Sequence, residues 1–286
     1  MALVLSAAAT SADGTSIGYQ VIGTGPGLVI LHGAMESASS HTELASELGD
    51  VHSVYLPDRR GRGRSGPHRS GHDIGAEVDD AAALVAATGA TDLVGVSSGA
   101  IIALEAALRL PEIRRVAIFE PPLVVGDSLS TAFVVRYQDE LARGDIPSAL
   151  VTGMKGAKMG PPIFAYVPRQ VLRALTVAAM RREERTLGAT EVSMRALAPT
   201  LGYDFRLAEQ AHDRLGAYAG IAAEVLLLGG ESSPEYLRTA MNAIAAALPH
   251  ARRIVFPGLG HGALGNRRFG GKPAVVAGPL KQFFSD

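Results

Sequence analysis

The sequence has no cysteine among its 286 residues, and it is poor in charge of either sign. The absence of cysteine excludes a disulfide scaffold, a thiolate nucleophile and cysteine-ligated zinc or iron–sulfur sites. Charged residues make up only 19% of the chain, and 27 Lys and Arg against 28 Asp and Glu leave a net charge of −1. No overall charge therefore draws the chain toward nucleic acid or a membrane surface.

Long apolar runs are also missing. No window approaches the roughly 18 uninterrupted apolar residues of a membrane-spanning helix. The apolar run near Met1 has no basic region before it and is shorter than the roughly 7–15 residues of a signal-peptide core. We therefore expect a cytoplasmic protein with no membrane partner, whose first residues begin a strand.

Short apolar runs bounded by turn residues recur along the chain, and such runs are typical of strands covered on both faces. They lie at 27–31, 51–56, 92–96, 115–119, 224–228 and 253–256. Helical periodicity separates them. Asp73 can cap one helix, and the capping-box pattern from Ser40 to Glu43 can open another. The alternation predicts an α/β fold with a doubly wound, mostly parallel sheet of about eight strands, edged by antiparallel strands up to Ser11 and over 15–22.

One segment breaks this alternation, because residues 124–216 show helical patterns and no strong strand signal. We predict a single core built from residues 1–123 and 217–286, interrupted by a helical cap or lid over 124–216, here called the cap segment. Its larger apolar side chains could line a substrate pocket or simply pack the cap against the core. They are Phe133, Met154, Met159, Phe164, Tyr166 and Met180.

Residues Gly95 to Gly99 read Gly-Val-Ser-Ser-Gly and join a predicted strand to an apolar helix. This is the G-x-S-x-G pattern in the strand–turn–helix context that exposes a serine hydroxyl above a sheet. The residues two positions either side of Ser97 must be small, since the strand and helix backbones approach each other there. Ser97 is therefore the candidate nucleophile.

A serine nucleophile needs a general base, which is usually histidine. His261 lies in a glycine-rich loop directly after the last core strand, where its imidazole can reach over the sheet edge. The other histidines lie at capping, strand, helical or polar loop positions and receive no chemical role. His32 is assigned to holding its own loop, while the backbone N–H groups of Ala34 and Ser98 are the candidate oxyanion donors.

Taken together, these motifs resemble the α/β-hydrolase superfamily. The match rests on His32-Gly33 after one strand, the D-x-R-G-x-G-x-S segment from Asp58 to Ser65 after the next, the turn at Ser97, and Gly260-His261 near the end. It covers nearly the whole chain and implies the α/β-hydrolase fold, with the cap segment where that family carries its lid.

The resemblance also bears on a cluster of arginines that could suggest nucleic-acid binding. The cluster consists of Arg59, Arg60, Arg62, Arg64 and Arg69. It has no interleaved aromatic residues, and in the family the equivalent loop is a structural turn organised by the residue at Asp58. We therefore expect no nucleic-acid partner.

The acid of the triad departs from the family pattern, which places it as G-x-x-D after the seventh strand. By the spacing from Gly230 that position holds Ser233, which has no carboxylate. Ser232 and Ser233 instead resemble helix caps ahead of Pro234. The acid is then either absent or supplied from elsewhere.

Two carboxylates could supply it. Glu120 ends the sixth predicted strand, and some family members, including one group of haloalkane dehalogenases, carry the acid at that place. Glu231 lies two residues before the expected position but is longer than an aspartate. We favour Glu120 and keep Glu231 as the alternative acid.

The predicted function is a serine hydrolase that cleaves an ester, thioester or lactone through an acyl-serine intermediate. Ser97 is the nucleophile, His261 the base, Glu120 the acid, and Ala34 and Ser98 supply the oxyanion hole. The prediction includes no metal and no cofactor, and it expects a small hydrophobic substrate. Haloalkane dehalogenases and epoxide hydrolases of this family carry an aspartate at the nucleophile position. The serine at position 97 therefore argues against both chemistries.

Two alternatives of other classes remain open at this stage. The same site could serve a non-hydrolytic enzyme, such as a lyase, a natural-product cyclase or a perhydrolase. It could also belong to a catalytically silent binding protein. The identity of the substrate and the oligomeric state are not predicted.

Overall fold

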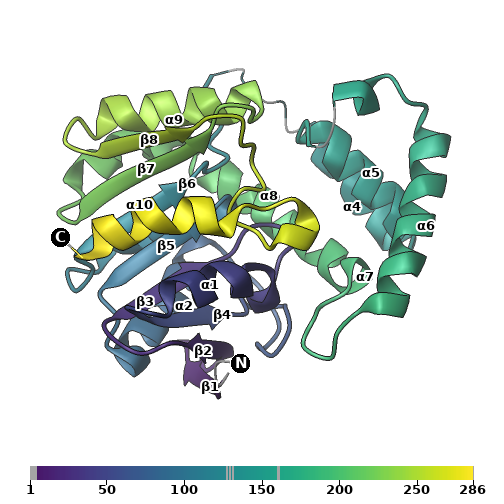
Figure 1. The fold of residues 1–286 in the computed structure, drawn as a ribbon. Coiled ribbons are helices and arrows are strands. Elements are labelled where there is room, and N and C mark those ends of the chain that lie inside the picture. Colours follow the sequence, from purple (N-terminus) through teal and green to yellow (C-terminus); the bar gives the residue numbers. More distant parts are fainter. Residues whose placement is uncertain (1–4, 127, 129, 131, 160–161, 286) are drawn as a thin grey trace.

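The structure is a computed structural model that describes residues 5–126, 128, 130, 132–159 and 162–285. Residues 1–4, where the predicted first strand begins, lie outside this range. Within it, eight strands form a sheet in the order β1-β2-β4-β3-β5-β6-β7-β8 (Figure 1). They are β1 (Leu5–Thr10), β2 (Ser16–Ile22), β3 (Gly27–Leu31), β4 (Ser53–Pro57), β5 (Asp92–Val96), β6 (Arg115–Phe119), β7 (Glu224–Gly230) and β8 (Arg252–Phe256).

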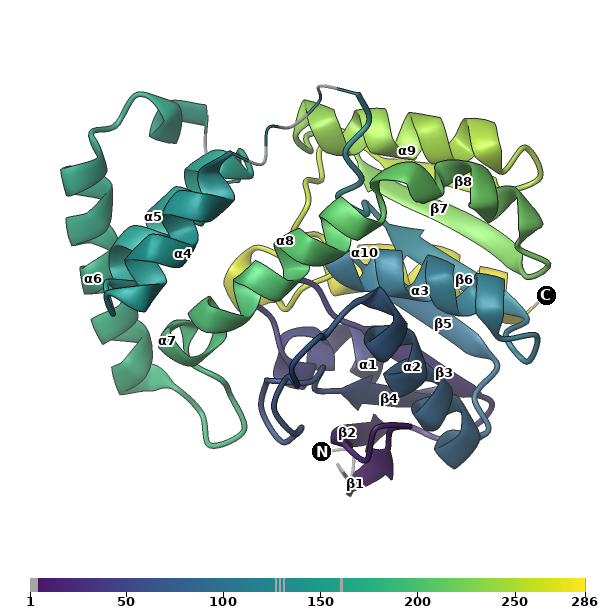
Figure 2. The ribbon, with the colours of Figure 1, turned by 180° about the vertical axis from the view of Figure 1, so that it is seen from behind.

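Strands β3 to β8 pair in parallel, while β1 and β2 form an antiparallel edge, so the predicted sheet is confirmed. The side chains of β3 alternate between the two faces, as the pleat requires. Leu28 and Ile30 pack under α1 and α10, whereas Val29 and Leu31 pack under α2, α3 and α9 (Figures 1 and 2). These helices are α1 (Thr42–Leu48), α2 (Ile74–Thr88), α3 (Ser98–Arg109), α9 (Glu235–Ala247) and α10 (Pro273–Ser285).

Helix α2 is capped as predicted, since the Asp73 carboxylate accepts a hydrogen bond from the Ala76 N–H at 3.0 Å. The capping box expected at Ser40 is wrong. A 3₁₀ turn, η1 (Ala38–His41), precedes α1, and the Ser40 hydroxyl accepts from the Ser37 N–H instead. The Glu43 N–H is satisfied by the side chain of Asn266, which is distant in sequence.

The caps predicted at Ser232 and Ser233 are also wrong. Helix α9 begins at Glu235 after Pro234, and no side-chain cap bonds its first turn. The Ser233 hydroxyl is buried without a hydrogen-bond partner among the described residues. The Leu237 N–H donates to the Pro234 carbonyl oxygen at 3.1 Å, so this donor of the first turn needs no serine hydroxyl.

The chain between β6 and β7 is helical. Its elements are α4 (Phe133–Ala142), α5 (Ile146–Gly156), η2 (Pro162–Ala165), α6 (Arg169–Thr186), α7 (Met194–Leu197), η3 (Ala198–Thr200), α8 (Leu201–Gln210) and η4 (His212–Gly220). Helices α4, α5 and α6 stand beside the sheet, and α8 leads the chain back to it (Figure 2). The turn η4 runs across the predicted boundary at 216. Its Tyr218 already packs in the core cluster under α3. Residues 127, 129, 131, 160 and 161 of the cap segment lie outside the described range, and its bounds stay a prediction.

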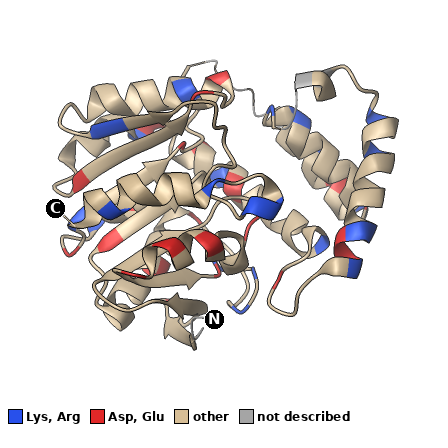
Figure 3. Ribbon diagram, in the orientation of Figure 1, with Lys and Arg blue, Asp and Glu red and all other residues tan. Residues whose placement is uncertain are grey.

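Charges of both signs occur across the ribbon, with a concentration of basic residues on α6 (Figure 3). Among the described helices, none combines the length and the apolar character needed to cross a bilayer.

Candidate active site

Ser97 lies at the sharp turn between β5 and α3, and its backbone has φ 53° and ψ −122°. A positive φ is unfavourable for a residue with a side chain, so the surrounding packing must hold this turn. A Cβ atom on Gly99 would lie 2.2 Å from the Leu31 carbonyl oxygen, and one on Gly95 would lie 2.5 Å from the Ala100 Cα. Only glycine fits at either position, which is the steric demand expected from the sequence pattern.

His261 comes from the loop between β8 and α10, and its Nε2 lies 3.1 Å from Ser97 Oγ. Its Nδ1 lies 2.7 Å from Glu120 Oε2. Because a carboxylate can only accept, Nδ1 carries the proton and Nε2 is left to accept from the Ser97 hydroxyl. The structure thus brings the predicted nucleophile, base and favoured acid into one hydrogen-bonded chain.

Glu120 directly follows β6, with a positive φ of 48° and only 1% of its side chain exposed. Its second oxygen, Oε1, accepts from the Gly230 N–H at 2.7 Å. Both carboxylate oxygens are therefore engaged, and the one that faces His261 cannot rotate away without losing a buried hydrogen bond. The alternative acid, Glu231, is exposed and instead accepts from the Gly258 N–H at 2.9 Å.

The turn after β3 carries the candidate oxyanion donor Ala34. A Cβ on Gly33 would come within 2.9 Å of Ser97 Cβ, so this turn passes directly beside the nucleophile. No protein acceptor for the Ala34 N–H is recorded among the described residues. The Ser98 N–H is the first of α3, and such an N–H has no acceptor within its own helix. Ala34 and Ser98 thus lie on the two turns that meet at Ser97, and their role as oxyanion donors stays a prediction.

His32 is buried and holds its own loop, since Nδ1 lies 2.9 Å from the Gly33 carbonyl and Nε2 accepts from the Arg59 N–H at 3.1 Å. Burial, helped by Arg62 and Arg59, lowers the pKa of His32 to about 3. A neutral ring with one donor and one acceptor matches both contacts.

Two of the arginines that follow β4, Arg59 and Arg62, are held by carboxylates inside the protein. Arg59 bonds both oxygens of Glu77 and also Asp204 of α8, while Arg62 bonds the other oxygen of Asp204. Asp204 additionally accepts from the Ser98 hydroxyl at 2.8 Å, which ties α8 to the first turn of α3. Sequence reasoning missed Asp204, because nothing in the local pattern of α8 marks it as the partner of an arginine 145 residues away.

Burial alone would raise the pKa of Asp204, but Arg62 and Arg59 outweigh burial and hold that pKa below its ordinary value. We therefore expect Asp204→Asn to destabilise the protein by about 3–5 kcal/mol, because it leaves buried guanidinium charge without its carboxylate partner. Urea unfolding would measure this difference. The difference should begin to shrink as the pH falls below about 4, where Asp204 takes up a proton in the unfolded chain. It should vanish only at the lower pH at which the folded carboxylate, with its depressed pKa, is protonated as well.

Asp213→Asn is the matched control for that measurement, since the Asp213 side chain is 98% exposed and follows α8 closely. A surface carboxylate of this kind should contribute well under about 1 kcal/mol. Equal unfolding midpoints for the two variants would contradict a structural role for the buried Asp204.

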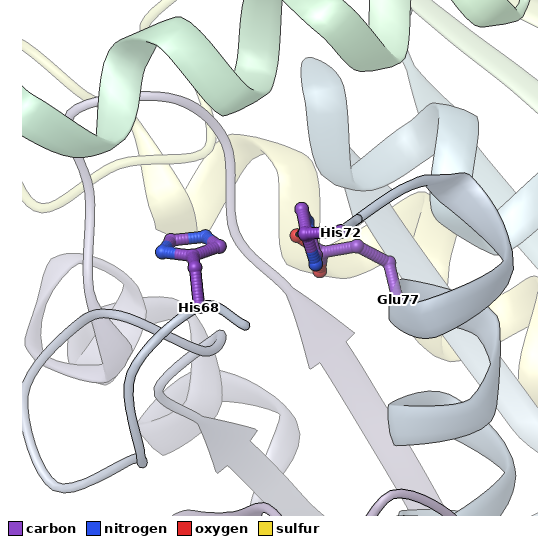
Figure 4. A group of neighbouring side chains, drawn as sticks. All are labelled: His68, His72 and Glu77. Atoms are coloured by element: carbon purple, nitrogen blue, oxygen red, sulfur yellow. Dashed lines mark ion pairs between the residues drawn. The ribbon is translucent and has the colours of Figure 1, made fainter. Parts of the chain in front are cut away.

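A group of two histidines and a glutamate lies beside these arginines (Figure 4). His72 Nε2 is 3.3 Å from Glu77 Oε1, and His68 stacks on Tyr203. Burial is the main reason that the pKa of His68 falls to about 3. Because Arg59 already bonds both oxygens of Glu77, a cation bound there would lie beside a guanidinium without compensating negative charge. The group therefore does not fit a metal ion.

Comparison with known proteins agrees with this fold. A model of the alpha/beta hydrolase family matches residues 28–276. That span is most of the chain and includes the turn at Ser97 and the loop of His261, and the chain belongs to this family.

Individual relatives cover most of the chain. Pimeloyl-[acyl-carrier protein] methyl ester esterase of Xanthomonas campestris is 28% identical over 250 residues, which are 84% of this chain and 90% of the relative. A 2-(acetamidomethylene)succinate hydrolase of Mesorhizobium japonicum is 26% identical over 243 residues, 84% of this chain and 82% of the relative. The crystal structure of an alpha/beta hydrolase from Sphaerobacter thermophilus has a TM-score of 0.78 and 30% identity, covering 97% of this chain and 100% of its own.

Proposed function

We propose that the protein is a serine hydrolase that cleaves an ester, thioester or lactone. The observation that carries the proposal is the hydrogen-bonded chain from Glu120 through His261 to Ser97, with distances of 2.7 and 3.1 Å. A hydroxyl bonded to a base that a buried carboxylate orients is the arrangement that activates serine. Family relatives named esterase and hydrolase support the same class of reaction.

The proposed reaction begins when His261 Nε2 takes the proton of Ser97 Oγ as this oxygen attacks the substrate carbonyl carbon. The N–H groups of Ala34 and Ser98 stabilise the negative oxygen of the tetrahedral intermediate. Glu120 stabilises the imidazolium, which then protonates the leaving alcohol, thiol or ring oxygen. Water, deprotonated by the same histidine, attacks the acyl-serine and releases the acid and free Ser97.

Apolar groups beside the turn that carries Ala34 support an acyl substrate of hydrophobic character. Ala34 and Met35 pack, together with Phe205, against a buried cluster of the cap segment that includes Tyr137. The Tyr236 hydroxyl of α9 contacts Met159 Sδ of the cap segment at 3.8 Å. Burial and the nearby charge of Glu120 together raise the pKa of Tyr236, so this phenol stays neutral.

Two of the residues that could line a substrate pocket differ sharply in exposure. Tyr166 is 88% exposed, and Met180 is only 1% exposed, on the side of α6 that faces inward. Met159 contacts Tyr236, so it is the methionine of the cap segment that we would substitute first to alter the choice of acyl group.

A fluorophosphonate probe tests the proposal directly, because it labels serine only where the hydroxyl is activated. We expect one probe per chain, with the modified peptide containing Ser97, and we expect the labelled protein to lose p-nitrophenyl ester hydrolysis. Mass spectrometry identifies the site. Absence of labelling would contradict the proposal and favour a binding protein, whereas labelling with non-hydrolytic products would favour a lyase, cyclase or perhydrolase.

A further inference from the structure

A second hydrogen-bonded pair, His41 and Glu36, lies beside the turn that carries Ala34. His41 ends η1, and Glu36 lies between β3 and η1. His41 Nε2 is 3.1 Å from Glu36 Oε2, and the imidazole is only 1% exposed. Sequence reasoning assigned no chemistry to this histidine, because neither its spacing from Ser97 nor its neighbours mark it.

Both ring nitrogens of His41 face oxygen atoms that can only accept a hydrogen bond. Nε2 faces the Glu36 carboxylate, and Nδ1 lies 3.0 Å from the Leu264 carbonyl oxygen. A neutral imidazole carries one N–H and can donate to only one of them. Both bonds form together only when the ring carries two protons and a positive charge.

The electrostatic surroundings of His41 agree with a charged ring. Burial by itself lowers the pKa of His41, but the Glu36 carboxylate outweighs burial and raises it above the ordinary value. Burial by itself raises the pKa of Glu36, but the neighbouring His41 outweighs burial and lowers this pKa to about 2.

The other ionisable groups around the pair do not compete for it. His32, in the loop before Glu36, stays neutral because burial lowers its pKa. On α1, the carboxylate of Glu43 pairs with Arg267 at the surface. The charges of His41 and Glu36 thus balance each other.

The pair connects the two loops on which the proposed reaction depends. Glu36 Oε2 also accepts from the Gly33 N–H at 2.7 Å, which closes the turn that contains Ala34. Met35 in this turn has φ 58°, so the turn needs such a restraint. At the other end, Leu264 lies three residues after His261, in the same loop.

We propose that His41 is a permanent imidazolium that acts with Glu36 as a positioning pair, setting the Ala34 N–H relative to the loop of His261. The inference rests on the proposed function, since a position for Ala34 matters only if it receives an oxyanion. Neither side chain takes a proton from the substrate. Their effect is on the geometry of the oxyanion hole, and therefore on kcat more than on KM.

The wild-type protein gives a readout that needs no activity and no substitution. Nitrogen-15 NMR of the ring at pH 7.5 should show two protonated nitrogens for His41, although an ordinary histidine with a pKa near 6.5 is mostly neutral there. A neutral His41 ring at this pH would overturn the inference. This result is independent of whether Ser97 reacts with the fluorophosphonate, so failure of the proposed function and failure of the inference remain distinguishable.

Substitution then tests the consequence for catalysis. We expect His41→Gln and Glu36→Gln each to lower kcat for a p-nitrophenyl ester by about 10- to 100-fold, with KM nearly unchanged, because a small displacement of a donor is costly. His250→Gln, at an exposed position, is the matched control and should retain wild-type kcat. Wild-type kcat in a folded Glu36→Gln or His41→Gln variant would refute the positioning role.

Discussion

Ser97→Ala should lower kcat for ester hydrolysis by about 10⁴- to 10⁶-fold, since it removes the atom that becomes acylated. The loss should fall on kcat rather than on substrate binding, because the oxyanion donors and the apolar contacts near Ala34 remain in place. Hydrolysis of a p-nitrophenyl ester by the purified variant measures the effect. The substitution should leave the backbone strain at φ 53° unchanged, because alanine and serine both carry a Cβ atom there.

Ser232→Ala provides the matched control, because Ser232 is an exposed serine in the loop after β7. It should behave as the wild type in the same assay. If the Ser97→Ala variant retained near wild-type hydrolysis while its fold and purity were intact, acyl transfer to Ser97 would be wrong as a mechanism.

Glu120→Gln is the second substitution with a large expected effect, a decrease in kcat of about 10⁴-fold. The amide is nearly isosteric, so the side chain should still fit in its buried position between His261 and the Gly230 N–H. It cannot stabilise the imidazolium as a carboxylate does. If its NH₂ group faces the ring, it also forces the proton onto Nε2, where it blocks acceptance from Ser97.

Glu231→Gln distinguishes the two carboxylates that the sequence left open. Glu231 is exposed and bonds the Gly258 N–H rather than the imidazole, so this variant should hydrolyse the ester nearly as fast as the wild type. Parallel measurement of kcat for both variants is the test. A steep loss in Glu231→Gln together with an active Glu120→Gln would assign the acid to Glu231.

The sheet was predictable because its strands are marked locally. Each of the six predicted apolar runs overlaps an observed parallel strand, and the antiparallel edge lies where the N-terminal pattern indicated. The helix caps were less predictable. Asn266 satisfies the N–H of Glu43 across the fold, and a contact over 223 residues leaves no trace in the few residues around the helix start.

The candidate site likewise contains one residue that is marked by its local sequence and one that is not. Ser97 could be located from the sequence alone, since a sharp turn between strand and helix requires glycine on both sides, and that requirement is visible in five consecutive residues. Glu120 could be named only as one of two candidates. Its contact with His261 spans 141 residues and depends on how β6 and the loop after β8 meet at one edge of the sheet.

The sequence by itself determined the strand–helix alternation, the absence of a thiolate nucleophile and the place of the sharp turn that carries Ser97. All three follow from residue type and short spacing. The tertiary structure decided which polar and charged groups meet: Glu120 with His261, His41 with Glu36 and the Leu264 carbonyl, and Asp204 with Arg59 and Arg62. The physical reason is that a buried polar group must find a partner wherever the packed chain brings one, and local periodicity does not record that partner.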